Sequence, residues 1–73
     1  MEHVLDVSGL LPPEPLERVL DALADLPAGD SLKVRLPAEP LLLYPMLRSM
    51  GMHWERRETG GAAVELVIRE LCP

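Results

Sequence analysis

The chain has very few aromatic residues and a single cysteine. Its 73 residues include Trp54 and Tyr44 but no phenylalanine, so a folded core has to be built from aliphatic side chains. Cys72 alone cannot form a disulfide within the chain, and the sequence contains no closely spaced cysteine and histidine ligands for a metal. We therefore expect no metal and no cofactor, and a stability that depends on packing or self-association.

Long apolar runs and an excess of basic residues are also missing. No segment approaches the roughly 20 apolar residues of a membrane-spanning helix. Glu2, His3 and Asp6 interrupt the start of the chain, where a secretory signal would be basic and then apolar. Together with the lone thiol, these features predict a cytoplasmic protein without a membrane partner. The formal net charge of −5 argues against a nucleic-acid partner.

The acidic residues are concentrated in the first part of the chain. Residues 1–30 contain seven acidic residues and one basic residue, Arg18, whereas residues 31–73 contain five acidic and six basic residues. Such an asymmetry can orient a partner, although solvated charges on exposed faces explain it as well.

The hydrophobic patterns predict a βαβαββ chain that forms a single domain over residues 1–73. Strands are expected at residues 3–7, 31–36, 52–58 and 62–70, and Thr59-Gly60-Gly61 is a hairpin signal between the last two. The first helix has apolar residues at helical spacing, namely Leu16, Val19, Leu20, Leu23 and Leu26. It ends before residues 27–30, where Gly29 suits a left-handed cap.

A second helix is expected over about residues 40–50. Pro40 suits its first turn, because a backbone N–H at that position has no hydrogen-bond partner within the helix and its loss costs little. Gly51 suits the C-terminal cap of this helix. The predicted inner stripe of this helix consists of Leu43, Met46, Leu47 and Met50.

Alternation within the strands predicts the number of layers. One face would present Leu5, Val7, Leu32, Val34, Leu36, Trp54, Val64, Leu66 and Ile68. The other face would present Asp6, Lys33, Arg35, His53, Glu55, Arg57, Glu65 and Arg69. Strands buried on both faces would be continuously apolar. We therefore expect an α+β fold, a two-layer α/β sandwich in which a four-stranded mixed sheet carries two helices on one face.

One stretch of the sequence resembles a known family. Residues Leu5-Asp-Val-Ser-Gly-Leu-Leu-Pro-Pro-Glu-Pro-Leu16 resemble the signature of TusA/SirA-like sulfur carriers, in which a strand and a glycine lead into Cys-Pro-x-Pro at the first helix. The Pro-x-Gly-Asp-Ser-Leu turn and the βαβαββ order are similar too, so the resemblance covers nearly the whole chain. Position 12, where the nucleophilic cysteine of that family would fall, is Pro12.

The chain is most similar to a cysteine-less branch of unknown function, DUF2249. The segments that resemble this branch are Pro12-Pro-Glu-Pro-Leu-Glu17 and Pro40-Leu-Leu-Leu-Tyr-Pro45. That branch often has a His-Asp pair shortly before the second helix. Here Ala38 and Glu39 stand in that place, so no role of the pair is carried over to this chain.

The prolines change what the start of the first helix can do. A persulfide carrier needs a thiolate that the helix N-terminal amides stabilise. Pro12, Pro13 and Pro15 supply neither sulfur nor N–H groups, which leaves Glu14 and Leu16 as the nearby backbone donors. The Glu14 carboxylate also repels an anion at this position. We therefore expect no catalytic residue here and a protein that is not an enzyme.

The leading hypothesis is a non-catalytic module that binds a protein partner or a small ligand. Proline-rich loops lower the entropy lost on binding, and two such loops, residues 9–15 and 37–44, supply the candidate binding residues. These are Gly9, Pro12, Pro13, Glu14, Pro15, Glu39 and Tyr44. Two alternatives are a sulfur-transfer or redox carrier that uses Cys72, and a weak homodimer through the polar sheet face.

Three further patterns have simpler explanations. His53 and Glu55, with His3, could bind a transition metal, but two histidines without close ligand spacing are better explained as solvated side chains. Arg56 and Arg57, with other sheet residues, could form a basic strip, although acidic residues interleave with it. The cluster of Met46, Met50 and Met52 is interpreted as filling of a core that lacks phenylalanine.

Overall fold

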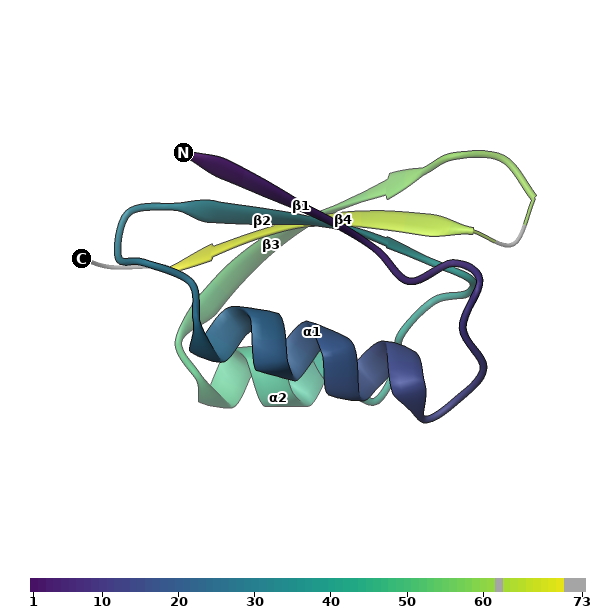
Figure 1. The fold of residues 1–73 in the computed structure, drawn as a ribbon, viewed down its shortest axis with the longest axis horizontal. Coiled ribbons are helices and arrows are strands. Elements are labelled where there is room, and N and C mark those ends of the chain that lie inside the picture. Colours follow the sequence, from purple (N-terminus) through teal and green to yellow (C-terminus); the bar gives the residue numbers. More distant parts are fainter. Residues whose placement is uncertain (62, 71–73) are drawn as a thin grey trace.

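The computed structural model describes residues 1–61 and 63–70, and within them the elements follow the predicted βαβαββ order. The strands are β1 (Glu2–Asp6), β2 (Ser31–Leu36), β3 (Met52–Glu58) and β4 (Val64–Glu70). The helices are α1 (Glu14–Ala24) and α2 (Leu43–Ser49). Both helices lie on the same face of the sheet, which confirms the predicted two-layer α+β fold (Figure 1).

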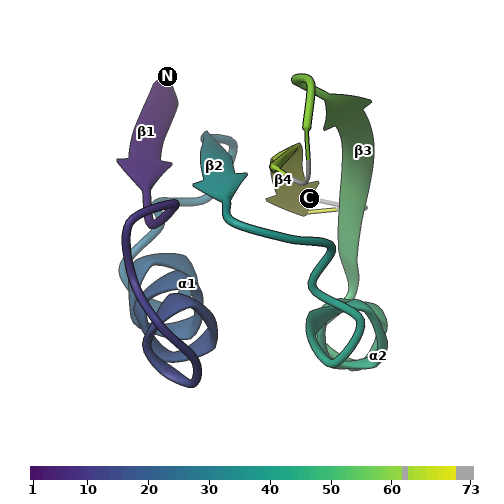
Figure 2. The ribbon, with the colours of Figure 1, turned by 90° about the vertical axis from the view of Figure 1, so that its right-hand side faces the viewer.

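The strands form a mixed sheet in the order β1-β2-β4-β3. β1 and β2 are parallel and are connected through α1, whereas β4 is antiparallel to both of its neighbours. The predicted hairpin joins β3 to β4, and Gly60 and Gly61 in its turn have φ values of 92° and 62°, which glycine adopts readily. Figure 2 shows α1 below β1 and β2, and α2 below β3.

The core is aliphatic, as the lack of phenylalanine requires. It consists of Val7, Val19, Leu23, Leu32, Val34, Leu36, Leu43, Leu47, Val64, Leu66 and Ile68. The alternate strand residues predicted to face the helices are the ones that are buried, apart from Leu5 and Trp54, which are partly buried and pack against this core. In α1 the predicted apolar stripe faces the sheet, with Val19 and Leu23 fully inside.

Several predicted element boundaries are wrong. β1 covers Glu2–Asp6 and not residues 3–7. α1 ends at Ala24 with Asp25 as its cap residue, so Gly29 is not the helix cap. The positive φ of Gly29, 87°, instead belongs to the turn that leads into β2. β4 begins at Val64 and not at residue 62, which lies outside the described residues.

The second helix is also shorter than predicted. α2 begins at Leu43, with Leu42 as its N-cap, so Pro40 lies in the loop before it. Pro45 instead occupies the first turn, where its missing N–H is not needed. Gly51 follows the helix with a φ of 73° and fulfils the predicted capping role.

The prediction that Met46 and Met50 lie in the core is wrong. Their exposed fractions are 40% and 45%, whereas Leu43 and Leu47 are completely buried. A helix of seven residues presents one narrow strip to the sheet, and the two leucines four positions apart occupy that strip. The two methionines flank it and line a shallow groove beside Leu20 of α1.

Candidate functional site

A cavity of about 350 Å³ lies between the loop before α1 and the segment that connects β2 to α2. The first wall is formed by Pro12, Pro13, Pro15 and Leu16, and the second wall by residues 36–43. Leu36 and Leu43 in the second wall belong to the buried core, so the cavity ends on the core itself. The two proline-rich loops that are far apart in the sequence therefore meet at one site.

The lining of this cavity is almost entirely carbon. Five of its residues are prolines, namely Pro12, Pro13, Pro15, Pro37 and Pro40. Because a proline has no backbone N–H, these positions present apolar surface from the main chain as well as from the ring. Of the twelve described residues that line the cavity, Glu39 is the one with a charge. Apolar concave surfaces with few polar groups are typical of binding sites.

The start of α1 offers few donors to an anion. Pro13 is the N-cap residue and forms no side-chain capping bond, and Pro15 occupies the second helical position. The amide of Glu14 donates a hydrogen bond to the Leu11 carbonyl at 3.0 Å. One of the two donors that the prolines leave near this end is therefore already used, and the site differs from the helix termini that bind phosphate.

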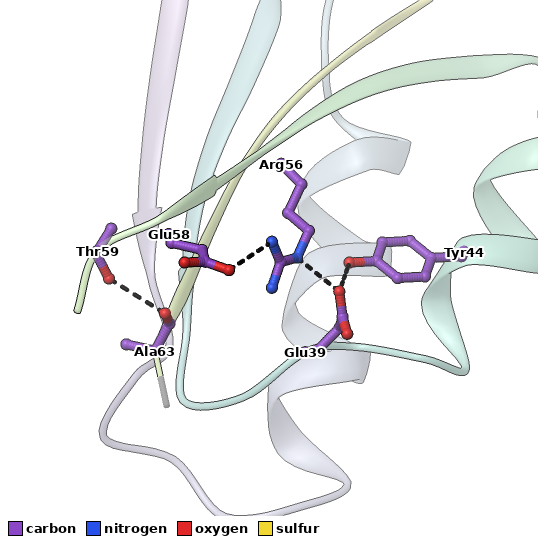
Figure 3. Close-up of polar contacts among 6 residues, drawn as sticks. All are labelled: Glu39, Tyr44, Arg56, Glu58, Thr59 and Ala63. Atoms are coloured by element: carbon purple, nitrogen blue, oxygen red, sulfur yellow. Dashed lines mark hydrogen bonds and ion pairs between the residues drawn. The ribbon is translucent and has the colours of Figure 1, made fainter. Parts of the chain in front are cut away.

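Glu39 connects the second wall of the cavity to the edge strand β3 (Figure 3). Its Oε1 accepts a hydrogen bond from the Tyr44 hydroxyl at 3.2 Å and lies 2.6 Å from Nε of Arg56. Arg56 also donates to Oε1 of Glu58 at 3.3 Å. The Tyr44 ring stacks on Trp54, with centroids 5.4 Å apart and an interplanar angle of 9°. These contacts hold the loop before α2 against the sheet.

The two hydrogen-bond donors to Glu39, Tyr44 and Arg56, both have raised pKa values. Burial raises the pKa of the Tyr44 hydroxyl, and the hydrogen bond to Glu39 raises it further. The hydrogen bond to Glu58 raises the pKa of Arg56, and Glu39 adds to this while burial opposes it. Tyr44 and Arg56 therefore keep their protons at neutral pH. They act here as hydrogen-bond donors that position Glu39.

The structure brings four of the seven predicted binding residues to the cavity, namely Pro12, Pro13, Pro15 and Glu39. Tyr44 lies behind Glu39 and contacts the cavity only through it. Glu14 is exposed at the first position of α1 and Gly9 is exposed in the preceding loop, and neither is among the residues that line the cavity. The structure therefore brings both predicted proline-rich loops to the cavity but places three of the seven predicted residues outside its lining.

Sequence reasoning missed three exposed leucines beside the cavity. Leu11, Leu41 and Leu42 have exposed fractions of 81%, 68% and 76%, and the last two line the cavity. The sequence predicts a helix that already includes Leu41 and Leu42, because a continuous run of leucines does not reveal where a helix begins.

Arg56 does not belong to the possible basic strip on the sheet. Arg56 lies on the helix side of the sheet, where it contacts Glu39, whereas Arg57 lies on the opposite side. The signal was present in the strand alternation, because Arg56 is two residues from the inward-facing Trp54.

Among residues 1–61 and 63–70, the histidine candidates do not come together in a second site. His3 forms a 2.7 Å hydrogen bond with Asp30, away from His53 on β3. Within residues 1–61 and 63–70, no group of three or more His, Cys, Asp or Glu side chains is placed to hold a metal ion. Cys72, the proposed alternative sulfur carrier, lies outside the described residues. Neither helix in this part of the chain has the length and apolar character needed to cross a membrane.

Comparison with known proteins identifies a family. The model of a family described as an uncharacterized conserved protein, DUF2249, matches residues 4–70. This match includes both walls of the cavity and the whole of the Glu39 cluster. No curated protein and no solved structure matches the chain.

Proposed function

The chain belongs to the DUF2249 family, and we propose that it is a non-catalytic binding module whose proline-lined cavity holds an apolar segment of a partner protein. One observation carries this proposal, namely an apolar cavity of about 350 Å³ that ends on the core and is bordered by exposed leucines. Its proline-rich walls are stiff, so little conformational entropy is lost when a ligand is bound.

The surroundings of the cavity favour a protein segment over an enclosed small molecule. Small-molecule pockets usually have volumes of about 300–1,000 Å³ and surround most of their ligand, so this cavity is at the lower end of the range. Leu41 and Leu42 in its lining are largely exposed, as is Leu11, which precedes the lining residue Pro12 in the chain. An extended segment can place one side chain in the cavity while its neighbours cover these leucines.

The charge near the cavity favours a partner with basic residues. The first turn of α1 carries Glu14 and Glu17, and its last turn has no basic residue. Glu39 is paired with Arg56, so its charge is largely compensated. Carboxylates on this first turn, which is joined to the cavity wall through Pro13 and Pro15, speed the encounter with a segment that has lysine or arginine beside its apolar residue.

The non-catalytic part of the proposal is supported by position 12. We propose that the DUF2249 scaffold is shared with TusA/SirA-like sulfur carriers but serves binding in this chain, because Pro12 supplies no nucleophile and the nearby Glu14 amide is engaged by Leu11. Incubation with a cysteine desulfurase and cysteine should therefore leave the purified chain without a persulfide. A labelled chain would contradict this part of the proposal.

A cavity-filling substitution tests the site directly. Ala38 is exposed and lines the cavity, so Ala38→Trp fills it without disturbing the core. Ala28 is also exposed but lies in the turn before β2, so Ala28→Trp is the matched control. Peptides selected from a displayed random library should contain an apolar residue flanked by basic residues, and should bind Ala38→Trp at least about tenfold more weakly than Ala28→Trp. Selected peptides that bind both variants equally would refute the site.

A further inference from the structure

One face of the sheet points away from both helices, and no other segment in the described part of the chain covers it (Figure 1). This outer face consists of three rows of side chains that run across the sheet, with one residue from each strand in every row. The rows contain most of the basic residues of the chain, and acidic residues lie beside them in the same rows.

The first row alternates in charge across the whole sheet. In the strand order β1-β2-β4-β3, the paired residues are Asp6, Arg35, Glu65 and Arg57. The row is therefore negative, positive, negative and positive. Read from the other edge, the same row has the opposite sign at every position, so it is complementary to a reversed copy of itself.

The second row contains Val4, Lys33, Val67 and Glu55. Reversing a copy of this row places Lys33 opposite Val67 of the second copy and Val4 opposite Glu55 of the second copy. The long aliphatic stems of lysine and glutamate can cover a valine while their charged ends stay near water. No like charges meet in this row.

The third row contains Glu2, Ser31, Arg69 and His53. A reversed copy places Glu2 opposite His53 of the second copy and Ser31 opposite Arg69 of the second copy. Both contacts are compatible with hydrogen bonding. All three rows therefore tolerate the same reversal.

A twofold axis parallel to the strands, passing between β2 and β4, produces this reversal. This axis reverses the order of the strands within each row, and it places each row opposite the same row of the second copy. In the first row it places Asp6 opposite Arg57 of the second copy, and Arg35 opposite Glu65 of the second copy, each contact occurring twice. Two sheets packed in this way keep nearly aligned strand directions, as face-to-face sheets do.

The charges also disfavour the arrangement with the twofold axis perpendicular to the strands. Such an axis would place Lys33 opposite its own copy and Glu55 opposite its own copy, and would bring Asp6 close to Glu2 of the second copy. These repulsive contacts outnumber the one attractive pair of carboxylate and guanidinium, Glu65 with Arg69 of the second copy. Like charges that face each other across an interface are strongly unfavourable. The face is thus complementary to itself in one orientation and repulsive in the other.

The outer face is also where two acidic protomers can approach each other. It carries four acidic residues (Glu2, Asp6, Glu55 and Glu65) and four basic residues (Lys33, Arg35, Arg57 and Arg69). The remaining eight acidic and three basic residues carry the whole net charge of −5. Within a protomer, Lys33–Glu65 and Arg57–Glu55 are 3.6 Å and 3.8 Å apart, longer than hydrogen bonds, so the charges of Lys33, Glu65 and Arg57 stay available to a second copy. Two acidic residues of this face are already engaged, because Glu55 accepts a hydrogen bond from Arg69 at 3.1 Å and Asp6 accepts one from the Ser8 hydroxyl at 2.6 Å.

We propose that the chain forms a homodimer through its outer face, with the twofold axis parallel to the strands. The contact is polar and covers one small sheet, so the dimer is weak and transient and its affinity falls as salt is added. The proline-lined cavity lies in the helix layer and remains open in the dimer. The dimer therefore presents two cavities on opposite sides, and a partner with two apolar segments would bind it with increased avidity.

Charge reversal in two separate variants tests this geometry. Arg35→Glu places a carboxylate opposite Glu65 of the second copy, and Glu65→Arg places a guanidinium opposite Arg35 of the second copy. Each variant alone should dimerise at least about a hundredfold more weakly than the wild type, because two such contacts become repulsive. An equimolar mixture of the two should dimerise again, because both contacts between positions 35 and 65 in the mixed dimer then join opposite charges.

The controls change the same charges on α1. Arg18→Glu and Asp21→Arg alter the net charge equally but lie on the helix side, so their dimerisation should match that of the wild type. Sedimentation velocity from micromolar to millimolar protein, at about 50 mM and about 500 mM salt, measures each sample. Circular dichroism confirms folding, and recovery in the mixture itself requires folded variants.

Three results would overturn the proposal. One is a wild type that stays monomeric at millimolar concentration and low salt. Another is a dimer that neither reversal weakens, which would place the interface elsewhere. The last is a mixture of two folded variants that remains monomeric, which would contradict the pairing of Arg35 with Glu65 of the second copy.

Discussion

Replacing Leu43 with alanine should weaken the domain by about 2–5 kcal/mol. The Leu43 side chain is completely buried, so the substitution loses about 2.4 kcal/mol of transfer free energy, at about 0.8 kcal/mol for each carbon group removed. The void that remains adds to this loss. A chain of 73 residues has a total stability of about 4–11 kcal/mol, at about 0.05–0.15 kcal/mol per residue, so the variant loses a large part of it.

The position of Leu43 extends the effect to the binding site. α2 has seven residues, which is too short to be stable alone, so the burial of Leu43 and Leu47 holds it on the sheet. Leu43 also lies in the second wall of the cavity. Its loss should therefore loosen that wall. It should also weaken the stacking of Tyr44 on Trp54, because Tyr44 belongs to the same helix.

Leu42→Ala is the matched control, because Leu42 also lines the cavity but is 76% exposed. Its free energy of unfolding should stay within about 0.5 kcal/mol of the wild type. Urea unfolding followed by the fluorescence of Trp54 and by circular dichroism measures both variants, with the m-values compared. Equal midpoints and equal m-values for the two variants would refute the packing argument.

Two further predictions concern the backbone and acid stability. Gly51→Ala should lower the free energy of unfolding by about 1 kcal/mol, because its φ of 73° is unfavourable for alanine. Gly9→Ala should be neutral, because Gly9 does not have a positive φ and a Cβ there meets no atom within 4 Å. Equal urea midpoints for the two variants would contradict this. The hydrogen bond from His3, together with the N-terminal ammonium, lowers the pKa of Asp30 from its ordinary value of 3.8. The ionised carboxylate therefore stabilises the folded state above that ordinary value, and this stabilisation is lost as the pH falls through the lowered pKa. Thermal midpoints below about pH 4 should therefore fall less steeply in Asp30→Asn than in the wild type, and parallel curves would contradict this.

The fold was largely predictable because its strands alternate so regularly. In β2 the residues Leu32, Val34 and Leu36 are buried, and the intervening charged residues lie on the outer face, as a period of two requires. Element ends were less predictable. The limits of α2 depend on where the loop from β2 meets the sheet, which is a tertiary property, so the proline at position 40 indicated a helix start that the chain does not use.

The site was predictable in location but not in detail. Proline-rich loops indicated two stiff segments, and the parallel β1–α1–β2 unit brings the ends that carry them together. The exposure of Leu41 and Leu42 could not be predicted, because it depends on the path of the loop and not on a local pattern. The contact of Arg56 with Glu39 joins residues 17 positions apart, and strand alternation indicated only the side of the sheet on which Arg56 lies.

The proline lining also determines how the cavity can be observed in solution. Five of its wall positions have no amide proton, so they give no signal in amide-detected nuclear magnetic resonance and no readout in hydrogen exchange. A bound segment can therefore cover these five positions without changing any amide signal from them. The methyl groups of Leu16, Leu41 and Leu42 face the same space, and isotopic labelling of leucine methyls is the means by which occupancy of this cavity becomes visible.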